Sequence, residues 1–508
     1  MKNHLFDGLF SACENERMLA KMDDGRYYSY QHALDVSARF ANRLVSLGVE
    51  PGDRVAVQAP KSIEAVMLYL ACVRAGAVYL PLNTAYTAAE VSYFLNDAGA
   101  RLFICDPKRK DELAPIAQEV GAKIETLGIW KHGTDNGGSM TDESVVVGDT
   151  FDNVERGPDD LAAILYTSGT TGRSKGAMLS HDNLLSNSQT LSELWQFTKD
   201  DLLLHALPIF HTHGLFVATN VVLLSGARMR FLNAFDLDTI IEALPECTAM
   251  MGVPTFYTRL LDDDRFDREL SKGMRLFISG SAPLLAETHV EFEKRTGHRI
   301  LERYGMTETN MNTSNPYDGE RRAGTVGMAL PGVEIRICDS ETGTPVPKGE
   351  IGVIEVKGPN VFQGYWQMPE KTKEEFRGDG FFITGDLARE DEDGYIHIVG
   401  REKDLIISGG FNIYPKEIES LLDDFEGVVE SAVVGVQHPD FGEAVVAIVV
   451  PQKGASLTED DLMSKLADQL ARFKQPKKIF LQDALPRNTM GKVQKNVLRE
   501  EHSGLFSN

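Results

Sequence analysis

The feature that most constrains the fold of this 508-residue chain is the alternation of helical and strand-like segments in its first half. The segment 31-QHALDVSARFANRLVSLG-48 has apolar residues at helical spacing and ends in a glycine. A strand-like segment at 53–60, a helical segment at 63–76 and a strand-like segment at 77–82 follow. The pattern recurs with strand-like segments at 161–167 and 275–280. This order predicts an α/β fold with a largely parallel sheet.

The pattern changes in the second half of the chain. Short strands separated by turn residues predict a β-rich subdomain over about residues 330–400. Strand patterns at 405–410, 429–436 and 443–450 then mix with helical patterns at 416–425 and 459–473. We therefore expect a large N-terminal α/β domain over 1–402 and a small α+β C-terminal domain over 403–508.

Composition excludes several classes of protein. A net charge of −23 argues against a nucleic-acid-binding surface. The longest apolar runs are too short or too polar to span a membrane, and the N-terminal segment has no secretory pattern. The five cysteines are scattered without a paired motif, so neither a disulfide framework nor a zinc site is expected. A reducing cytoplasmic location with no membrane partner fits these observations.

The stretch 167-TSGTTGRSKG-176 follows an apolar strand pattern and has the composition of a phosphate-binding loop. Glycines let backbone N–H groups converge on an anion, hydroxyl groups add donors, and Lys175 adds charge. The stretch does not fit the Walker A spacing, because Ser174 stands where that motif needs its second glycine. A flexible surface loop is the alternative reading.

Six further motifs occur in order along the chain: 208-PIFHTHG-214, 279-SGSAPL-284, 303-RYGMTET-309, 384-TGD-386, 401-REKDLIISGGFNIYPKEIE-419 and 486-PRNTMGK-492. Together with the glycine-rich stretch, this series resembles the acyl-adenylate-forming superfamily, which includes acyl-CoA synthetases, luciferases and nonribosomal adenylation domains. One departure is Ser174, where the superfamily commonly has proline. The resemblance covers nearly the whole chain.

The resemblance implies binding sites for ATP, Mg²⁺ and coenzyme A. Nucleotide and CoA contacts are implied for Thr167, Ser168, Gly169, Thr170, Thr171, Gly172, Ser281, Ala282, Pro283, Tyr304, Gly305, Met306, Asp386, Arg401, Ser408, Gly409 and Gly410. Catalytic roles are implied for Lys175, His211, Thr307, Glu308 and Lys492. Glu308 and Thr167 are the expected metal ligands, since Mg²⁺ prefers oxygen donors.

The resemblance also implies a two-step reaction. A carboxylate attacks the α-phosphorus of ATP to give an acyl-adenylate, and the CoA thiol then displaces AMP. Lys492 is expected to neutralise charge in the first step, and the C-terminal domain to rotate about Lys403 before the second. Reversible acetylation of Lys492 by an acetyltransferase and a deacetylase would switch off the first step.

The residues near the acyl motifs predict a small dicarboxylic acid as substrate. Arg303 precedes Tyr304 where many superfamily members carry a neutral residue, and a buried arginine needs an anionic partner. A second carboxylate on the substrate would supply one. The expected pocket residues are Arg303, His211, Thr212, Ser279 and Met311. The stretches HTHGLF, SGSAPLLAETH and ERYGMTETNMNTSNP resemble malonate-activating members of the superfamily. This resemblance implies malonate as the substrate and methylmalonate as a second one, unless Arg303 instead pairs with a nearby Asp or Glu.

Other functions remain open from the sequence. A CoA ligase for another short-chain or aryl acid differs mainly at Arg303, and a luciferase-like oxygenase would use the adenylate with oxygen instead of a thiol. A binding module without chemistry disagrees with the intact set of charged motif residues. A carrier-loading adenylation domain is less expected, because no thiolation domain follows within this sequence.

Overall fold

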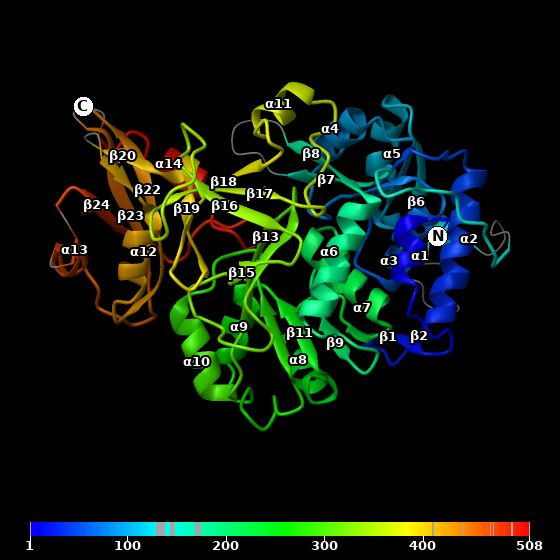
Figure 1. The fold of residues 1–508 in the computed structure, drawn as a ribbon, viewed down its shortest axis with the longest axis horizontal. Coiled ribbons are helices and arrows are strands. Elements are labelled where there is room, and N and C mark those ends of the chain that lie inside the picture. The colour runs from blue at the N-terminus through cyan, green and yellow to red at the C-terminus, as the bar shows by residue number, and fades with distance from the viewer. Residues whose placement is uncertain are drawn as a thin grey trace. The chain divides into compact units, whose positions relative to one another are not determined.

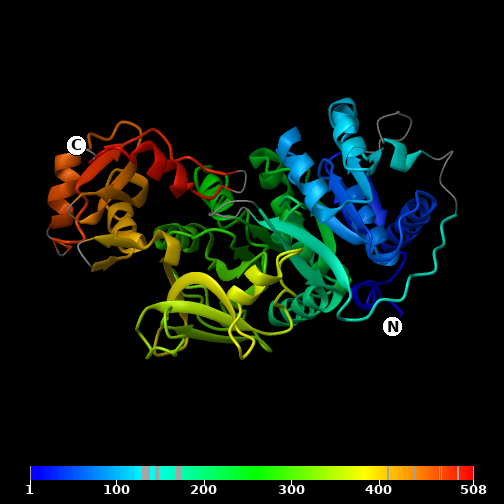
Figure 2. The same ribbon diagram turned by 90° about the horizontal axis from the view of Figure 1, so that it is seen from above.

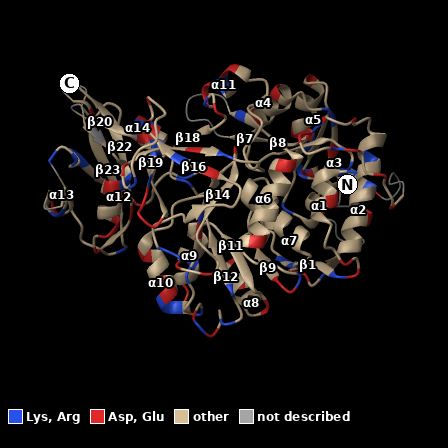
Figure 3. Cartoon of the chain, viewed as in Figure 1, with Lys and Arg blue, Asp and Glu red and all other residues tan. Residues whose placement is uncertain are grey.

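The computed structural model describes residues 2–128, 138–142, 148–167, 174–408, 411–439, 441–467, 469–470, 472–488 and 491–506. The chain forms two compact units (Figure 1; Figure 2 gives the view from above). Unit 1 consists of Met1–Ala323, Gly327–Glu334 and Val356–Phe382, and unit 2 of Gly324–Val326, Ile335–Glu355 and Ile383–Asn508. Acidic and basic residues are interspersed along the elements of both units (Figure 3).

Unit 1 contains a six-stranded sheet in the order β6-β5-β3-β4-β7-β8. Its strands are β3 (Arg54–Gln58), β4 (Val78–Pro81), β5 (Leu102–Cys105), β6 (Lys123–Thr126), β7 (Leu161–Thr167) and β8 (Lys175–Ser180). All neighbouring pairs are parallel except β7 with β8. This parallel order confirms the prediction made from the alternation of helices and strands.

A nine-stranded sheet in unit 1 runs in the order β15-β14-β13-β12-β11-β9-β10-β1-β2. Its strands are β1 (Met18–Met22), β2 (Tyr27–Ser29), β9 (Leu202–His205), β10 (Arg228–Phe231), β11 (Ala249–Gly252), β12 (Leu276–Ser279), β13 (Leu301–Met306), β14 (Asn310–Ser314) and β15 (Met328–Ala329). Strands β13, β12, β11, β9, β10 and β1 pair in parallel with their neighbours in that order. Strand β2 at one end of the sheet, and β14 and β15 at the other, pair antiparallel.

Helices connect the parallel strands of unit 1. They are α1 (His4–Leu9), α2 (Tyr30–Ser46), α3 (Ile63–Arg74), α4 (Ala88–Ala98), α5 (Lys110–Glu119), α6 (His181–Leu194), α7 (Asn220–Ser225), α8 (Leu237–Ala243), α9 (Pro254–Leu261), α10 (Ala286–Thr296) and α11 (Pro369–Glu374). A π-helix, His213–Thr219, precedes α7. Helix α3 is buried along its whole length, so it packs inside the unit instead of covering it. No helix in the described part of the chain is both long and apolar enough to cross a lipid bilayer.

Unit 2 holds most of a four-stranded sheet, β16-β17-β18-β19, and a five-stranded sheet in which β24 joins the series β21-β20-β23-β22 at β23. The strands are β16 (Glu334–Cys338), β17 (Gly352–Lys357), β18 (Phe382–Glu390), β19 (Ile396–Arg401), β20 (Ile406–Ser408), β21 (Phe411–Ile413), β22 (Val428–His438), β23 (Gly442–Pro451) and β24 (Lys478–Leu481). The helices are α12 (Pro415–Asp423), α13 (Glu459–Ala467) and α14 (Lys495–Glu501).

The apolar run of β22 is explained by burial on both of its faces. Val433 packs in one cluster with residues of α12 and α13, and its neighbour Val434 packs in another with Leu498 of α14. The predicted helix over 459–473 was too long, because α13 ends at Ala467 and the chain then turns. The predicted α/β fold with a small α+β C-terminal part is confirmed. A domain boundary at residues 402 and 403 stays a prediction.

Candidate active site

The predicted phosphate-binding stretch begins at the end of one strand and ends in the next, which is antiparallel to it. Strand β7 ends at Thr167 and β8 begins at Lys175, and these residues face each other across the antiparallel pair. The Thr167 hydroxyl donates to the Lys175 carbonyl oxygen at 3.5 Å. A Walker A loop instead connects a strand to a helix, so the two motifs differ in structure as well as spacing. The predicted ligands Ser168, Gly169, Thr170, Thr171 and Gly172 lie outside the described residues.

Lys175 and Glu308 belong to one cluster of charged and polar groups. Lys175 Nζ lies 2.8 Å from Glu375 Oε1 and 4.1 Å from the centre of the Tyr365 ring. The Tyr365 hydroxyl lies 2.6 Å from Glu375 Oε2 and 3.0 Å from Glu308 Oε1. The fold therefore brings the predicted phosphate-binding lysine and the predicted metal-binding carboxylate together through two residues that the sequence did not single out.

A tight hairpin between β13 and β14 positions Thr307 and Glu308. Gly305 has no room for a side chain, because a Cβ atom there would lie 1.9 Å from the Asn310 carbonyl oxygen. Asn310 has a φ of 51°, a left-handed conformation that Asn adopts more readily than most residues. Glu308 is buried, while Thr307 lines a small pocket together with His211.

Four buried side chains at the acyl-site motifs carry polar atoms with no hydrogen-bond partner in the described part of the chain. They are Thr212 Oγ1, His213 Nε2, Ser279 Oγ, and both Nε and Nη2 of Arg303. Arg303 is 3% exposed, and burial lowers its pKa to about 9, so it is protonated at neutral pH. Burying a cation and three polar groups without partners is costly, and an anionic ligand would supply the acceptor that Arg303 lacks.

These four side chains come from adjacent elements. Ser279 ends β12, which pairs in parallel with the strand that carries Arg303. Ser281 Oγ contacts His213 Nδ1 at 3.2 Å. A Cβ atom on Gly280 would lie only 2.4 Å from Arg303 Cζ, so a larger residue there would displace the guanidinium from its present position. The short segment 279–281 therefore contacts both the histidine and the arginine.

The local electrostatics favour an anion at this point. Burial, followed by the charge of Arg303, lowers the pKa of His213 well below its ordinary value. A neutral imidazole can donate one hydrogen bond without adding charge. The acidic neighbour of Arg303, Glu302, is engaged elsewhere, because its Oε1 lies 3.1 Å from His289 Nδ1. Arg303 is thus not held by the carboxylate next to it in sequence.

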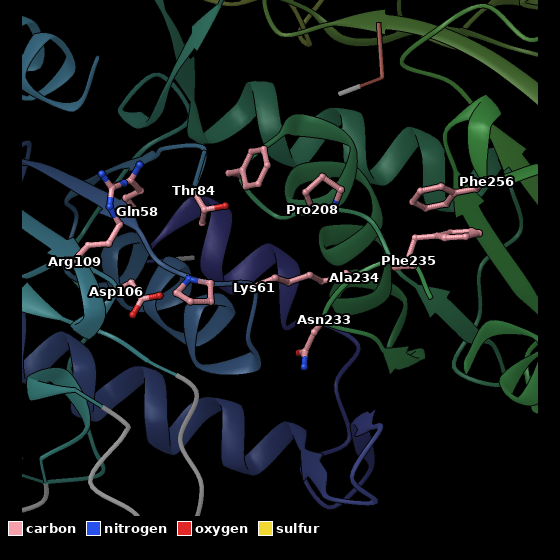
Figure 4. A pocket seen from close by; sticks show the side chains of 13 residues that line it. Gln58, Lys61, Thr84, Asp106, Arg109, Pro208, Asn233, Ala234, Phe235 and Phe256 are labelled. Atoms are coloured by element: carbon pink, nitrogen blue, oxygen red, sulfur yellow. The ribbon is translucent and has the colours of Figure 1, made fainter. Parts of the chain in front are cut away.

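A larger cavity of about 560 Å³ lies at the carboxyl ends of parallel strands (Figure 4). Ligands of open α/β sheets commonly bind at this edge. Its wall includes the basic side chains of Lys61 and Arg109, the acidic side chain of Asp106, and the aromatic rings of Phe210, Phe235 and Phe256. Phe210 also lines the small pocket that holds His211 and Thr307, so the two hollows adjoin.

The two basic side chains of this cavity donate hydrogen bonds to groups of the protein. Lys61 Nζ donates to the His205 carbonyl oxygen at 2.9 Å and lies 3.1 Å from His205 Nδ1. Burial lowers the pKa of Lys61 well below its ordinary value, so an anion in the cavity would favour its charged form. Arg109 donates to Gln58 Oε1 at 2.8 Å and to the Tyr86 carbonyl oxygen at 3.0 Å.

Unit 2 contains the remaining predicted site residues. Asp386 and Arg401 face each other across β18 and β19, and Asp386 Oδ1 lies 2.5 Å from Arg401 Nε. Lys403 lies in an exposed turn, and Lys492 is exposed in a short loop before α14. Ser408 is buried at the end of β20, whereas Gly409 and Gly410 lie outside the described residues.

Five further predicted residues of unit 1 lie on β13 or β14, or directly follow β12 in the chain. Met311 is buried on β14, and Tyr304 and Met306 flank Gly305 on β13. Ala282 and Pro283 follow Ser281 after β12. The roles assigned to these residues, to Asp386 and Arg401, and to Lys403 and Lys492 stay predictions.

Sequence reasoning missed four residues of this region: His213, Gly280, Tyr365 and Glu375. His213 and Gly280 stand inside motifs that were recognised, so a closer reading of 208–214 and 279–284 could have found them. Tyr365 and Glu375 lie outside those motifs and reach the site only through the fold. No pattern in the sequence marks them.

Comparison with known families agrees with this site. Residues 11–366 match the family model described as AMP-binding enzyme, and residues 417–492 match the model described as AMP-binding enzyme C-terminal domain. The chain belongs to the AMP-binding enzyme family. The predicted resemblance to the acyl-adenylate-forming superfamily is thereby confirmed.

Individual relatives cover nearly the whole chain. A malonate–CoA ligase of Arabidopsis thaliana is 35% identical over 98% of this chain and 88% of its own length. A feruloyl-CoA synthase of Amycolatopsis is 36% identical over 91% of each chain. The crystal structure of ATP-bound MatB from Rhodopseudomonas palustris is 59% identical, covers 100% of both chains and has a TM-score of 0.97. Since relatives at 35% and 36% identity differ in the acid they are named for, the acyl pocket must decide the substrate.

Proposed function

We propose that this protein is an ATP-dependent ligase that makes malonyl-CoA from malonate and CoA. The reaction passes through malonyl-adenylate and releases AMP and pyrophosphate, with methylmalonate as a second substrate. The observation that supports malonate is the buried Arg303, whose Nε and Nη2 find no acceptor among the described residues. A malonate carboxylate can accept both bonds of the guanidinium while the other carboxylate reacts.

Malonate also fits the other groups of the pocket. Thr212, His213 and Ser279 each present a buried polar atom with no partner in the described chain. A feruloyl group is large and mostly apolar, and it would leave these atoms and the Arg303 charge unsatisfied. A CoA ligase for another short-chain or aryl acid is therefore the weaker alternative.

In the first step a malonate carboxylate oxygen attacks the α-phosphorus of ATP. The bond from that phosphorus to the pyrophosphate oxygen breaks, giving malonyl-adenylate. Lys175 holds the phosphates, Thr307 donates to the α-phosphate, and Lys492 neutralises the charge that builds up in the transition state. In the second step the CoA sulfur attacks the acyl carbon, loses its proton and expels AMP.

The donor set fits a magnesium ion bound with ATP. Glu308 is a buried carboxylate beside the phosphate hairpin, and the Thr167 hydroxyl stands at the end of β7. Among the described residues there is no cluster of three or more His, Cys, Asp or Glu that could hold a metal alone. Mg²⁺ suits such a site, because it takes most of its ligands from phosphates and water. When bound, it would neutralise phosphate charge.

The large cavity is the proposed site for the phosphate-bearing end of CoA. It has two basic side chains, one carboxylate (Asp106) and three aromatic rings in its wall, and it adjoins the pocket of His211 and Thr307 where the acyl group reacts. Lys61→Met is expected to raise the KM for CoA about tenfold, which corresponds to about 1.4 kcal/mol for one lost charge-assisted contact. Pantetheine, which lacks the nucleotide, should be used equally well by both enzymes.

Steady-state kinetics with CoA and with pantetheine would check this expectation. Lys110→Met is the matched control, because Lys110 is exposed near the cavity but does not line it. An unchanged KM for CoA in Lys61→Met would place the nucleotide end of CoA elsewhere.

The experiment that tests the whole proposal is pyrophosphate release with MgATP and CoA across a panel of acids. Malonate, methylmalonate, succinate, acetate, butyrate, octanoate and coumarate form the panel. A sharp maximum at malonate, with acetate poor, is expected. A maximum at a monocarboxylate would retain the adenylation chemistry and overturn both the substrate and the role of Arg303.

Regulation by acetylation belongs to the same proposal. Lys492 is exposed within unit 2, so an acetyltransferase and a deacetylase in the cytoplasm could reach it. Acetylation would remove its charge and block adenylate formation while leaving its backbone contacts intact. The expected readout is loss of pyrophosphate release after acetylation of Lys492, with recovery on deacetylation.

A further inference from the structure

Glu375 links Lys175 and Glu308, two residues of the phosphate site that are far apart in the sequence. Its Oε1 lies 2.8 Å from Lys175 Nζ and 3.2 Å from Lys371 Nζ. Its Oε2 lies 2.6 Å from the Tyr365 hydroxyl, which in turn lies 3.0 Å from Glu308 Oε1. One carboxylate therefore contacts the phosphate-binding lysine directly and the candidate metal ligand through one intermediate.

The intermediate, Tyr365, is fixed by its backbone. Residues on either side of it pair with β8, because Trp366 N–H donates to the Gly176 carbonyl at 2.7 Å and the Gly364 carbonyl accepts from Met178 N–H at 2.9 Å. Tyr365 N–H itself donates to Thr372 Oγ1 at 2.9 Å. The ring is thereby held in place beside the lysine that begins the same strand.

The single phenolic hydrogen couples the two carboxylates. A phenol carries one donor hydrogen, and Tyr365 has a carboxylate oxygen of Glu308 and one of Glu375 within hydrogen-bond distance. The position of Glu375 therefore affects the bond that Tyr365 can make to Glu308. Lys175 and Lys371 both lie within ion-pair distance of Glu375 and balance its charge.

We propose that Glu375 is a positioning residue of the ATP site. It holds Lys175 by an ion pair and, through Tyr365, orients the Glu308 carboxylate. The inference rests on the proposed function only in requiring that this site bind MgATP, and it does not depend on which acid is activated. Preorganised charges lower the cost of binding the phosphates.

Glu375 would act on ATP binding by two routes, directly through Lys175 and indirectly through Tyr365 and Glu308. Measuring ATP affinity with and without the metal separates them. Equilibrium dialysis would give the dissociation constant of ATP in excess Mg²⁺ and in EDTA. Glu375→Gln is expected to weaken metal-free ATP about fivefold, through Lys175, and MgATP about twentyfold, through both routes. Tyr365→Phe keeps the ring under Lys175 and removes only the hydroxyl, so it should weaken MgATP about fourfold and leave metal-free ATP unchanged.

The double variant tests the coupling. If Glu375 acts on Glu308 only through Tyr365, the double variant should show the same loss of MgATP binding as Glu375→Gln alone. Glu374→Gln is the matched control, since this neighbouring side chain is 66% exposed and contacts only Lys371 among the described acidic–basic pairs. Glu375→Asp, which keeps the charge, should lie between the parent and Glu375→Gln.

Several results would overturn the proposal. Tighter ATP binding by Glu375→Gln would show that the carboxylate competes with phosphate instead of positioning Lys175. Unchanged ATP affinity of Glu375→Gln in both conditions would show that Glu375 does not position Lys175. Additive losses in the double variant would show that Glu375 does not act on Glu308 through Tyr365. An incorrect substrate assignment would instead appear in the acid panel and leave these binding constants unaltered.

Discussion

Replacing Arg303 with methionine is expected to lower kcat/KM for malonate about 300-fold, while acetate activation stays within about threefold of the parent enzyme. The loss corresponds to about 3.4 kcal/mol, within the range for truncating one partner of a buried charge pair. Acetate has no second carboxylate, so it gains nothing from the guanidinium. Pyrophosphate release with each acid at saturating MgATP and CoA measures both values.

The same variant should separate function from stability. Arg303 is 3% exposed, and two of its nitrogens have no described acceptor. Its buried charge therefore destabilises the folded protein when no ligand is bound. Methionine keeps a flexible apolar stem and removes that charge. We therefore expect the Tm of Arg303→Met to equal or exceed that of the parent enzyme, even though malonate activity is lost.

Two further variants test the geometry of this site. Arg303→Lys keeps a charge but not the planar fork, so malonate activity should remain well below the parent value. Gly280→Ala keeps Arg303 and places a methyl group 2.4 Å from its Cζ, which should displace the guanidinium and impair malonate selectively. The control is Arg299→Ala, because Arg299 pairs with Glu293 at 2.7 Å near the surface. Equal losses with malonate and acetate would make Arg303 a structural residue.

The sequence predicted the parts of the site that lie on recurring local patterns. Strand β7 is predicted by an apolar run, and Arg303 stands out as an unexpected charge at the start of a recognised motif. Such features depend on neighbours in the chain, so periodicity and motif spacing reveal them. The approach of Gly280 to Arg303 and of Ser281 to His213 depends on strand pairing and tertiary packing, which local patterns do not reveal.

The contacts of Glu375 show what the sequence could not supply. Lys175 and Glu375 are 200 residues apart, and an acidic residue after a short charged helix is most often solvated. Only the pairing of the segment around Tyr365 with β8 brings them together. The end of α13 was missed for a related reason, because an amphipathic pattern continues past Ala467 where the chain already turns.

Replacing Lys492 with alanine is expected to slow malonyl-adenylate formation at least about 10³-fold, equivalent to about 4 kcal/mol of lost transition-state stabilisation. Thioester formation from synthetic malonyl-adenylate and CoA should stay within about threefold of the parent rate. The first step builds negative charge at phosphorus that a lysine can neutralise. The second step attacks the acyl carbon and expels AMP, so it has no need of that charge.

The local structure indicates that Lys492 can be replaced without loss of its backbone hydrogen bonds. Lys492 N–H donates to Asn488 Oδ1 at 3.0 Å, and Asn488 N–H donates to the Lys492 carbonyl at 2.9 Å. Both contacts use the Lys492 backbone, so alanine keeps them, and the exposed side chain contributes little to folding. Lys453→Ala, another exposed lysine of unit 2, is the control.

Malonate-dependent exchange of pyrophosphate into ATP reports the first step, and thiol consumption with synthetic adenylate reports the second. Lys492→Gln, which imitates an acetylated lysine, should behave like Lys492→Ala in both assays. If both variants lose the two steps equally, Lys492 also serves the thiol reaction. A selective loss would mean that one exposed charge controls adenylation alone, and a reversible modification there could stop ATP use without unfolding the enzyme.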